Sequence, residues 1–377
     1  MAPVLHARFS ASAAERWIAC PVSVPKSDGI PDKPSAAADE GTKAHAVAEE
    51  ALTKLTFLHG DVKPEGEMQE GAALYTETVY AYRIVDSVLE IEKQSPGLAS
   101  IDEDLGGTTD TRLYRPVMSD IVVIDYKYGK GYAVEAVENK QMLTYALGAL
   151  IDAEPGVAYD EVEMTIVQPR AYHPAGPVRS WRVPVARVWQ HAEDVLAAIA
   201  EARSGEGKPK PGKHCHFCPA LITCPAHTAV AEFSAQQVQH DTGFPGTLSA
   251  GALAEAADLA DILDMWVSAV RKELAARIGA GQHVPGFKAV QKRGTRAWVN
   301  EGVALAAILA RFKASREDVT ITKLASPAAV EKIVGKAQMR ILADVITSES
   351  SGWTVAPESD TRPAVNVGPV SEFTPVG

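Results

Sequence analysis

The sequence predicts an α/β fold in which helices flank a central sheet. Helical periodicity occupies residues 12–19 and 39–52, and a further helix is expected over 66–94. Strand-like segments follow between residues 98 and 134, and a helix over 137–151 precedes more strands. This order is typical of a sheet covered by helices: helices come first, then a run of strands, a crossover helix and further strands.

The elements after the crossover helix extend this pattern. Strands are predicted over 161–168 and 179–183, followed by a helix over 185–203. The Gly-, Lys- and Pro-rich stretch at 207–213 cannot continue that helix, so it is predicted to be a linker.

Length and composition limit the class of protein. A chain of 377 residues is long enough for two or more domains. With 46% hydrophobic and 23% charged residues it is an ordinary globular chain, and no stretch approaches the roughly 20 apolar residues that span a bilayer. The net charge of −11 argues against a protein that coats nucleic acid by bulk electrostatics. This charge does not exclude a nuclease, because an acidic metal site contacts phosphate through its bound cation.

The candidate catalytic residues are concentrated between residues 106 and 145. Asp110 ends a Gly-Thr-Thr-Asp segment, and Asp125 and Lys127 follow the apolar run at 121–124. Side chains two apart in a strand share a face, so Asp125 and Lys127 are predicted to point the same way. Two carboxylates and an ammonium suit a hydrolase that holds Mg²⁺ or Mn²⁺ and stabilises charge on a phosphate.

Three further residues are candidates by their spacing. Gln141 and Tyr145 are four apart in a predicted helix, so they share one helical face. His45 lies inside the predicted helix at 39–52. A lone helical histidine is ordinarily a hydrogen-bonded packing residue, and a nearby metal site would make it a candidate ligand.

The cysteines form a second candidate site. Cys215, Cys218 and Cys224 are spaced as C-x₂-C-x₅-C, and such clustered thiolates select a soft metal centre. Cys20 is the one other cysteine in the sequence, and a Cys₄ set suits either zinc or an iron–sulfur cluster. Three nearby histidines are competing donors for a zinc site: His214, His216 and His227.

These motifs together resemble the RecB-like branch of the PD-(D/E)xK nuclease superfamily, specifically its iron–sulfur members and a family found in phages and prophages. The resemblance covers roughly residues 8–228. It rests on the order of a helical histidine, G-x-x-D, D-x-K, Q-x₃-Y and a split cysteine set. It implies a restriction-endonuclease-like core, a central mixed sheet flanked by helices.

The resemblance also implies roles for the candidate residues. The divalent cation, Mg²⁺ or Mn²⁺, would be bound by His45, Asp110, Asp125 and the carbonyl of Tyr126. Lys127 would polarise the attacking water and stabilise charge on the phosphate, and Gln141 and Tyr145 would position DNA or the carboxylates. A [4Fe-4S] cluster would be bound by Cys20, Cys215, Cys218 and Cys224. Asp125 stands where many relatives have glutamate, which shortens its reach by one methylene.

The expected organisation has three regions. Residues 1–228 form the nuclease domain, 229–350 an α-rich region and 351–377 a disordered tail. Within the middle region, apolar residues from 253 to 274 predict a long helix, and residues 285–299 predict a basic hairpin. Its basic side chains are either a solvated edge or a DNA contact: Lys288, Lys292, Arg293 and Arg296.

The leading hypothesis is a metal-dependent DNA nuclease, expected to be an exonuclease acting on single strands or duplex ends in phage recombination. The expected partners are DNA and a phage recombinase or single-strand-binding protein, without a membrane. Because the N-terminus has no basic-then-apolar signal pattern, the expected location is the cytoplasm of a bacterial host cell. Two alternatives stay open: a catalytically inactive DNA-end-binding or recombinase-partner protein, and a zinc-stabilised structural protein.

Overall fold

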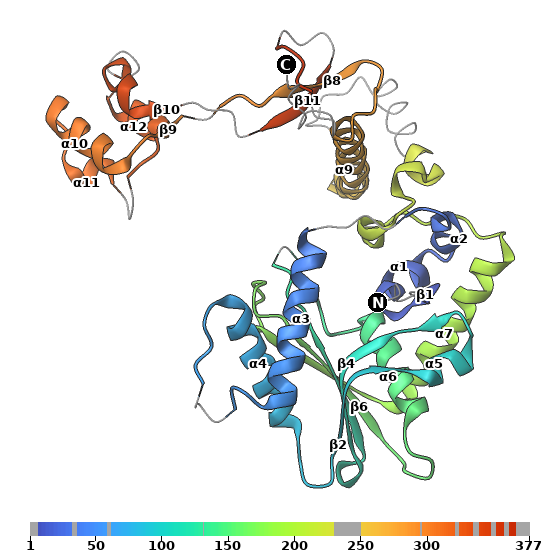
Figure 1. Ribbon diagram of the computed structural model, residues 1–377. Helices are drawn as coiled ribbons and strands as arrows, with labels where there is room; N and C mark the ends of the chain where they lie inside the picture. Colours follow the sequence, from blue (N-terminus) through green and yellow to red (C-terminus); the bar gives the residue numbers. More distant parts are fainter. Residues whose placement is uncertain are drawn as a thin grey trace, which may run out of the picture. The chain divides into compact units, whose positions relative to one another are not determined.

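The structure is a computed structural model in which the chain forms two compact units, Met1–Trp266 and Val267–Gly377 (Figure 1). The described residues are 7–31, 36–58, 62–130, 132–229, 250–294, 296–320, 324–334, 339–347, 352–357 and 362–366. The division between the units falls later than residue 228, where the sequence predicted the first domain to end. Residues 230–249 lie outside the described residues.

The first unit is built on a five-stranded mixed sheet with the order β2-β4-β5-β6-β7. Its strands are β2 (Val88–Gln94), β4 (Thr108–Arg115), β5 (Asp120–Tyr126), β6 (Glu161–Val167) and β7 (Val178–Pro184). The β5 and β6 strands are parallel, and the other neighbours are antiparallel. As a result β2, β5 and β6 end, at Gln94, Tyr126 and Val167, where β4 and β7 begin. We call this end of the sheet the site edge.

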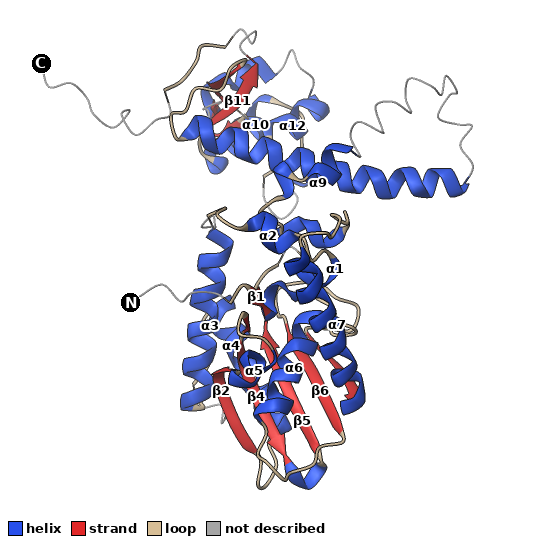
Figure 2. Ribbon diagram, turned by 90° about the vertical axis from the view of Figure 1, so that its right-hand side faces the viewer, coloured by secondary structure: helices blue, strands red, loops and turns tan. Residues whose placement is uncertain are grey.

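Helices cover both faces of the sheet, which confirms the predicted α/β class (Figures 1 and 2). One face packs against α3 (Ala36–Lys54) and α4 (Glu67–Tyr82). The opposite face packs against α1 (Ala14–Ala19), α5 (Pro96–Ile101), α6 (Lys140–Asp152) and α7 (Val185–Ser204). Smaller elements complete the unit: β1 (Phe9–Ser10), α2 (Ser23–Ser27), β3 (Leu105–Gly106), η3 (Lys213–Phe217) and η4 (Leu221–Thr223), among others.

Strand β5 is buried along its whole length and divides the core in two. Ile121 and Val123 belong to the apolar cluster beneath α6, whereas Val122, Ile124 and Tyr126 belong to the cluster beneath α3 and α4. This alternation follows from the two-residue period of a strand. It sends the side chains of consecutive residues at the site edge to opposite faces.

Two predicted elements of this unit are wrong. The helix expected over 66–94 ends at Tyr82, and the chain turns at Asp86, whose φ is 64°, before entering β2. Pairing of β2 with β4 outweighs the helical periodicity there, because tertiary contacts override local propensity. Residues 98–101, expected to be strand-like, belong to α5, which begins at Pro96, where a missing N–H costs nothing.

The predicted long helix is present, but the strands of the second unit pair differently from the prediction. Helix α9 (Ala250–Gly279) spans the unit boundary. Strand β8 (Phe287–Gln291) pairs with β11 (Trp353–Pro357), and β9 (Ala297–Trp298) pairs with β10 (Ile346–Thr347). The predicted hairpin over 285–299 is therefore wrong, because each strand finds its partner far along the chain. The remaining elements are α10 (Glu301–Arg311), α11 (Arg316–Val319), α12 (Pro327–Val334) and η6 (Arg340–Val345).

Strand β11 lies within the segment predicted to be a disordered tail, 351–377, and corrects that prediction for its own residues. Its backbone pairs with β8, and Ala364 bridges to Val290. Residues 351, 358–361 and 367–377 of this segment lie outside the described residues. Within the part of the chain that the structure describes, no helix combines the length and apolarity that crossing a membrane would require.

His191 is a fully buried histidine between α6 and α7. The Thr144 hydroxyl donates to the Lys140 carbonyl at 2.7 Å, so it accepts from the Nε2–H of His191 at 2.9 Å. Nδ1 is left without a hydrogen-bond partner. Burial, together with the cations Lys140 and Arg187, lowers the pKa of His191 to about 3.

We therefore expect His191 to make stability depend on pH. The unfolded chain binds a proton here below its ordinary pKa of 6.5, whereas the folded chain does so only near 3. The stabilising contribution is full above pH 6.5 and is lost as the pH falls toward 3, by at most about 1.4 kcal/mol per pH unit. Urea denaturation at pH 7 and pH 5 should show wild type losing stability relative to His191→Gln. Parallel curves would contradict this, and His283→Gln, at an exposed position in the second unit, is the control.

Candidate functional site

The site edge brings together the candidate residues that lie far apart in the sequence. Asp110 lies near the start of β4, and Asp125 lies near the end of β5. Lys127 is the first residue after β5. His45 reaches the edge from α3 on one face, and Gln141 and Tyr145 reach it from α6 on the other. One local cluster therefore contains every residue of the predicted catalytic set.

Asp110 is the contact point between β4, β5 and α3. Its Oδ2 accepts the Tyr126 N–H at 2.7 Å and lies 3.5 Å from Nδ1 of His45. Burial lowers the pKa of His45, against the opposing effect of Asp125 and of a hydrogen bond to the backbone of Tyr126. A neutral imidazole keeps the lone pair that a metal ligand needs.

Glu92 is a residue of this site that the sequence did not reveal. Among the described residues, one ligand atom each from His45, Glu92 and Asp110 lie within 4.8 Å of one another, which is close enough to share one metal ion. Glu92 has a φ of 47°, a left-handed conformation that costs energy for a residue with a side chain. The segment was predicted to be helical, so Glu92 was not considered as a site residue. The alternation of apolar and charged residues in Leu89-Glu90-Ile91-Glu92 could have predicted the strand, but it does not indicate that Glu92 lies at the site.

A buried arginine holds the chain just after Glu92. Arg112 is fully buried, and its Nη2 donates to the carbonyls of Lys93 and Gln94 at 3.0 and 2.9 Å. Its Nη1 donates to Asp152 at 2.8 Å. Arg112 thereby ties the edge strand β2 to the end of α6 and supports the strained backbone at Glu92.

Asp125 is turned toward α6 and lies outside the three-ligand group. Its Oδ2 is 2.9 Å from Nζ of Lys127, and its Oδ1 accepts from Nε2 of Gln141 at 3.2 Å. Gln141 also accepts from Lys127 at 3.1 Å and donates to the Tyr145 hydroxyl at 3.1 Å. By the alternation of β5, Asp125 shares the α6 face with Val123. Metal ligation by Asp125 and by the Tyr126 carbonyl stays a prediction.

The site contains more carboxylates than cationic side chains, which favours binding of a cation. Burial raises the pKa of Asp110, and the neighbouring Asp125 raises it further. Burial also raises the pKa of Glu92 to about 7, with help from Glu49 and Asp125. Lys127 is the nearby ammonium; burial alone would lower its pKa, but Asp125 and Asp110 outweigh burial and raise it. Two buried carboxylates and the half-buried Glu92 lie beside one lysine, so a divalent ion would balance the charge of the carboxylates when they ionise.

Gly107 explains the first position of the G-x-x-D motif. A Cβ at this residue would lie 2.8 Å from the Ala11 side chain and 3.0 Å from the Tyr145 ring. Only glycine lets both side chains approach the chain this closely. The motif therefore serves packing at its glycine and chemistry at its aspartate.

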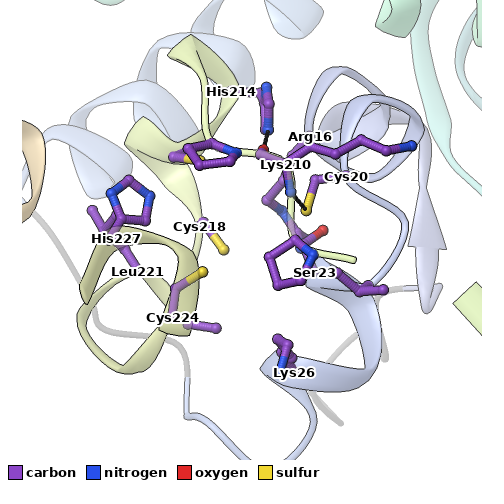
Figure 3. A pocket seen from close by; sticks show the side chains of 15 residues that line it. Arg16, Cys20, Ser23, Lys26, Lys210, His214, Cys218, Leu221, Cys224 and His227 are labelled. Carbon is purple, nitrogen blue, oxygen red and sulfur yellow. Dashed lines mark hydrogen bonds between the residues drawn. The ribbon is translucent and has the colours of Figure 1, made fainter. Parts of the chain in front are cut away.

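The four cysteines line one pocket (Figure 3). Cys20 follows the last residue of α1, Cys215 lies in η3, Cys218 follows η3 and Cys224 follows η4. All four thiols are free. The structure thus brings Cys20 to a cluster about two hundred residues further along the chain.

Polar groups around this pocket favour an anionic occupant. Arg16, Lys26 and Lys210 are among the lining residues, and the Lys210 N–H donates to the Cys20 sulfur at 3.4 Å. Of the competing histidines, His214 contacts the Lys210 carbonyl at 2.8 Å, and the His216 ring packs against Phe217. His227 is buried, and neither of its ring nitrogens has a hydrogen-bond partner.

The predicted basic residues of the second unit are not gathered in a hairpin. Lys288 lies on β8, and Lys292 and Arg293 follow that strand at exposed positions. Arg296 forms an ion pair with Glu331, which offsets its charge. Their contact with DNA stays a prediction.

Two solved structures are similar to this chain. An alkaline exonuclease (LHK-Exo) from Laribacter hongkongensis is 14% identical, with 52% of this chain and 93% of that one covered and a TM-score of 0.23. A phage-related exonuclease from Haemophilus somnus 129PT is 16% identical, with 54% and 96% covered and a TM-score of 0.25.

A family model described as a protein of unknown function, DUF2800, matches residues 6–363. This match spans both compact units. The chain therefore belongs to the DUF2800 family.

Proposed function

We propose that the protein is a divalent-metal-dependent DNA nuclease whose metal is held by His45, Glu92 and Asp110. The observation that carries the proposal is the juxtaposition of these three ligand atoms, within 4.8 Å of one another, with the Asp125–Lys127 ion pair at one sheet edge. One imidazole and two carboxylates suit Mn²⁺ or Mg²⁺. When bound, the ion would polarise a phosphate oxygen and lower the pKa of a bound water.

The chain's own residues supply the rest of the site. Lys127 stays cationic, so its ammonium can stabilise charge that develops on a phosphate. Asp125 holds this ammonium from one side, and the Gln141 carbonyl oxygen accepts from it on the other. Tyr145 completes the network by accepting from Gln141. The network fixes the lysine before substrate arrives, which is how a charged group stabilises a transition state without reorganising.

The biological setting belongs to the same proposal. The proposed action is exonucleolytic, on DNA ends, in phage recombination or end processing in a bacterial cytoplasm. A phage recombinase or a single-strand-binding protein is the corresponding partner.

The cysteine pocket is proposed to hold a [4Fe-4S] cluster bound by Cys20, Cys215, Cys218 and Cys224. Sulfurs around one tetrahedral zinc, at about 2.3 Å from it, lie about 3.8 Å apart. Among the described residues, no three cysteine or histidine ligand atoms of this pocket lie within 4.8 Å of one another. A cluster of several metal ions separates its thiolates more widely than one ion does, and the surrounding cations suit its negative charge. The cluster would join α1 to the chain after α7 and contribute folding free energy.

The nuclease proposal predicts metal-dependent cleavage. Purified wild type with Mn²⁺ should degrade end-labelled DNA, and Asp110→Asn or Lys127→Ala should slow this by about 10²-fold or more. Asp110→Asn removes the charge of a metal ligand, and Lys127→Ala removes the ammonium that stabilises charge on the phosphate. Matched controls are Asp28→Asn and Lys54→Ala, both at exposed positions. Circular dichroism should be unchanged in all four variants. Absence of cleavage by wild type on single-stranded and duplex DNA would favour a DNA-end-binding protein instead.

Glu92 is predicted to be a metal ligand. Glu92→Gln preserves the shape of the side chain but removes its charge, so we expect Mn²⁺ to bind at least about 10-fold more weakly, as seen when groups that support a metal are lost. Electron paramagnetic resonance of free Mn²⁺ during titration measures this without DNA. Glu50→Gln, an exposed position on α3, is the control. Unchanged affinity in Glu92→Gln, with binding lost in Asp110→Asn, would exclude Glu92.

The cluster proposal predicts a coloured protein. Anaerobic preparations should be brown, absorb near about 400 nm and contain about four irons per chain. Cys20→Ser should lose iron and melt at a lower temperature, whereas Ser12→Ala, at an exposed position of the same segment, should not. A colourless wild type with about one zinc per chain would overturn the cluster assignment in favour of zinc.

A further inference from the structure

The loops that follow β5 and β6 are joined into one surface at the site edge. We call residues 127–130 and 132–139, together with 168–177, the paired loops. Gln168 is buried, and its Nε2 donates to the carbonyls of Gly129 and Tyr132 at 2.9 and 2.8 Å. Its Oε1 accepts the Val134 N–H at 2.9 Å.

Further bonds make this surface rigid. Arg179 donates to the Val134 carbonyl at 3.0 and 2.8 Å and to Oε1 of Gln168 at 2.8 Å. His173 contacts Glu135 at 2.9 Å across the two loops. The paired loops are therefore a built platform held by buried polar groups.

Two aromatic rings stand free on this platform. Tyr132 is 73% exposed and Tyr172 is 90% exposed. They lie on loops that two contacts join: Gln168 donates to the Tyr132 carbonyl, and His173, the residue after Tyr172, contacts Glu135. Lys130 is also exposed, two residues before Tyr132.

The third tyrosine of the paired loops, Tyr128, has a packing role. Tyr128 is buried, and the guanidinium of Arg170 lies 4.1 Å from its ring centroid. Arg170 in turn pairs with Glu40 of α3 and Glu67 of α4. Tyr128 and Arg170 thus secure the platform to the helices beside His45, whereas the rings of Tyr132 and Tyr172 have no such packing role.

We propose that the paired loops bind single-stranded DNA, with bases stacked on Tyr132 and Tyr172 and phosphates near Lys130. This inference rests on the proposed function, since it names the form of DNA that reaches the metal site. Stacking on aromatic rings is tolerant of sequence and requires unpaired bases, whose faces a duplex covers. A chain with a net charge of −11 gains little from bulk attraction to phosphates, so stacking supplies a larger share of its affinity.

The test measures binding apart from cleavage. Fluorescence anisotropy with a labelled oligothymidine of about 20 nucleotides, in Ca²⁺ instead of Mn²⁺, is compared with a blunt duplex of equal length. Each stacked base contributes about 1–3 kcal/mol, so the double variant Tyr132→Ala/Tyr172→Ala should bind the single strand at least about 10-fold more weakly. Duplex affinity should change little. The double variant Tyr132→Phe/Tyr172→Phe keeps both rings and should bind like wild type.

Tyr80→Ala is the matched control, because Tyr80 is 41% exposed near the end of α4, away from the site edge. Unchanged single-strand affinity in the double alanine variant, with circular dichroism as in wild type, would overturn the inference while leaving the nuclease proposal intact. An RNA oligomer bound as tightly, with the same dependence on the tyrosines, would overturn the assignment to DNA. Tyrosine-dependent binding by a wild type that never cleaves would support the inference and reject the nuclease.

Discussion

The pleat of β5 is the constraint on which the rest of the site depends. The strand is buried on both faces, so its register cannot slip by one residue without moving apolar side chains out of both cores. At its end, this alternation turns Asp125 toward α6 and the Tyr126 side chain toward α3. The peptide N–H between them donates to Asp110 and joins β4 to the same corner. One strand thereby positions Asp125 toward Lys127 and Gln141 and, through the Tyr126 N–H, holds Asp110 at the same corner.

Burial turns this arrangement into a chemical site. Burial raises the pKa values of Asp110 and Glu92, and the neighbouring charge of Asp125 raises both further. Lys127 stabilises some of this charge, because its two carboxylate neighbours outweigh its own burial. The remaining deficit of positive charge is what a divalent ion would supply. The strained backbone at Glu92 fits the same account, since strain persists where surrounding structure enforces it, and Arg112 provides that enforcement.

The cysteine pocket and the paired loops support the site in different ways. The pocket joins the end of α1 to the segment after residue 210, so a metal centre there would close the first unit on itself. The paired loops follow β5 and β6 at the site edge, and Gln168 is buried between them. Both regions are irregular chain held in place by polar contacts. Binding residues are often found on such loops, which a rigid sheet positions.

Local sequence determined much of this protein, because strand alternation, helical spacing and cysteine spacing act over a few residues. These patterns placed Asp125 and Lys127 at a strand end, Gln141 and Tyr145 on one helical face, and three cysteines together. Tertiary structure alone decided that Glu92 joins the ligand group, because a left-handed residue in an edge strand has no local signature. It also decided that Asp125 faces α6 and that β8 pairs with β11. Packing and strand pairing join residues that are far apart in the sequence, and local periodicity does not indicate which distant residues will meet.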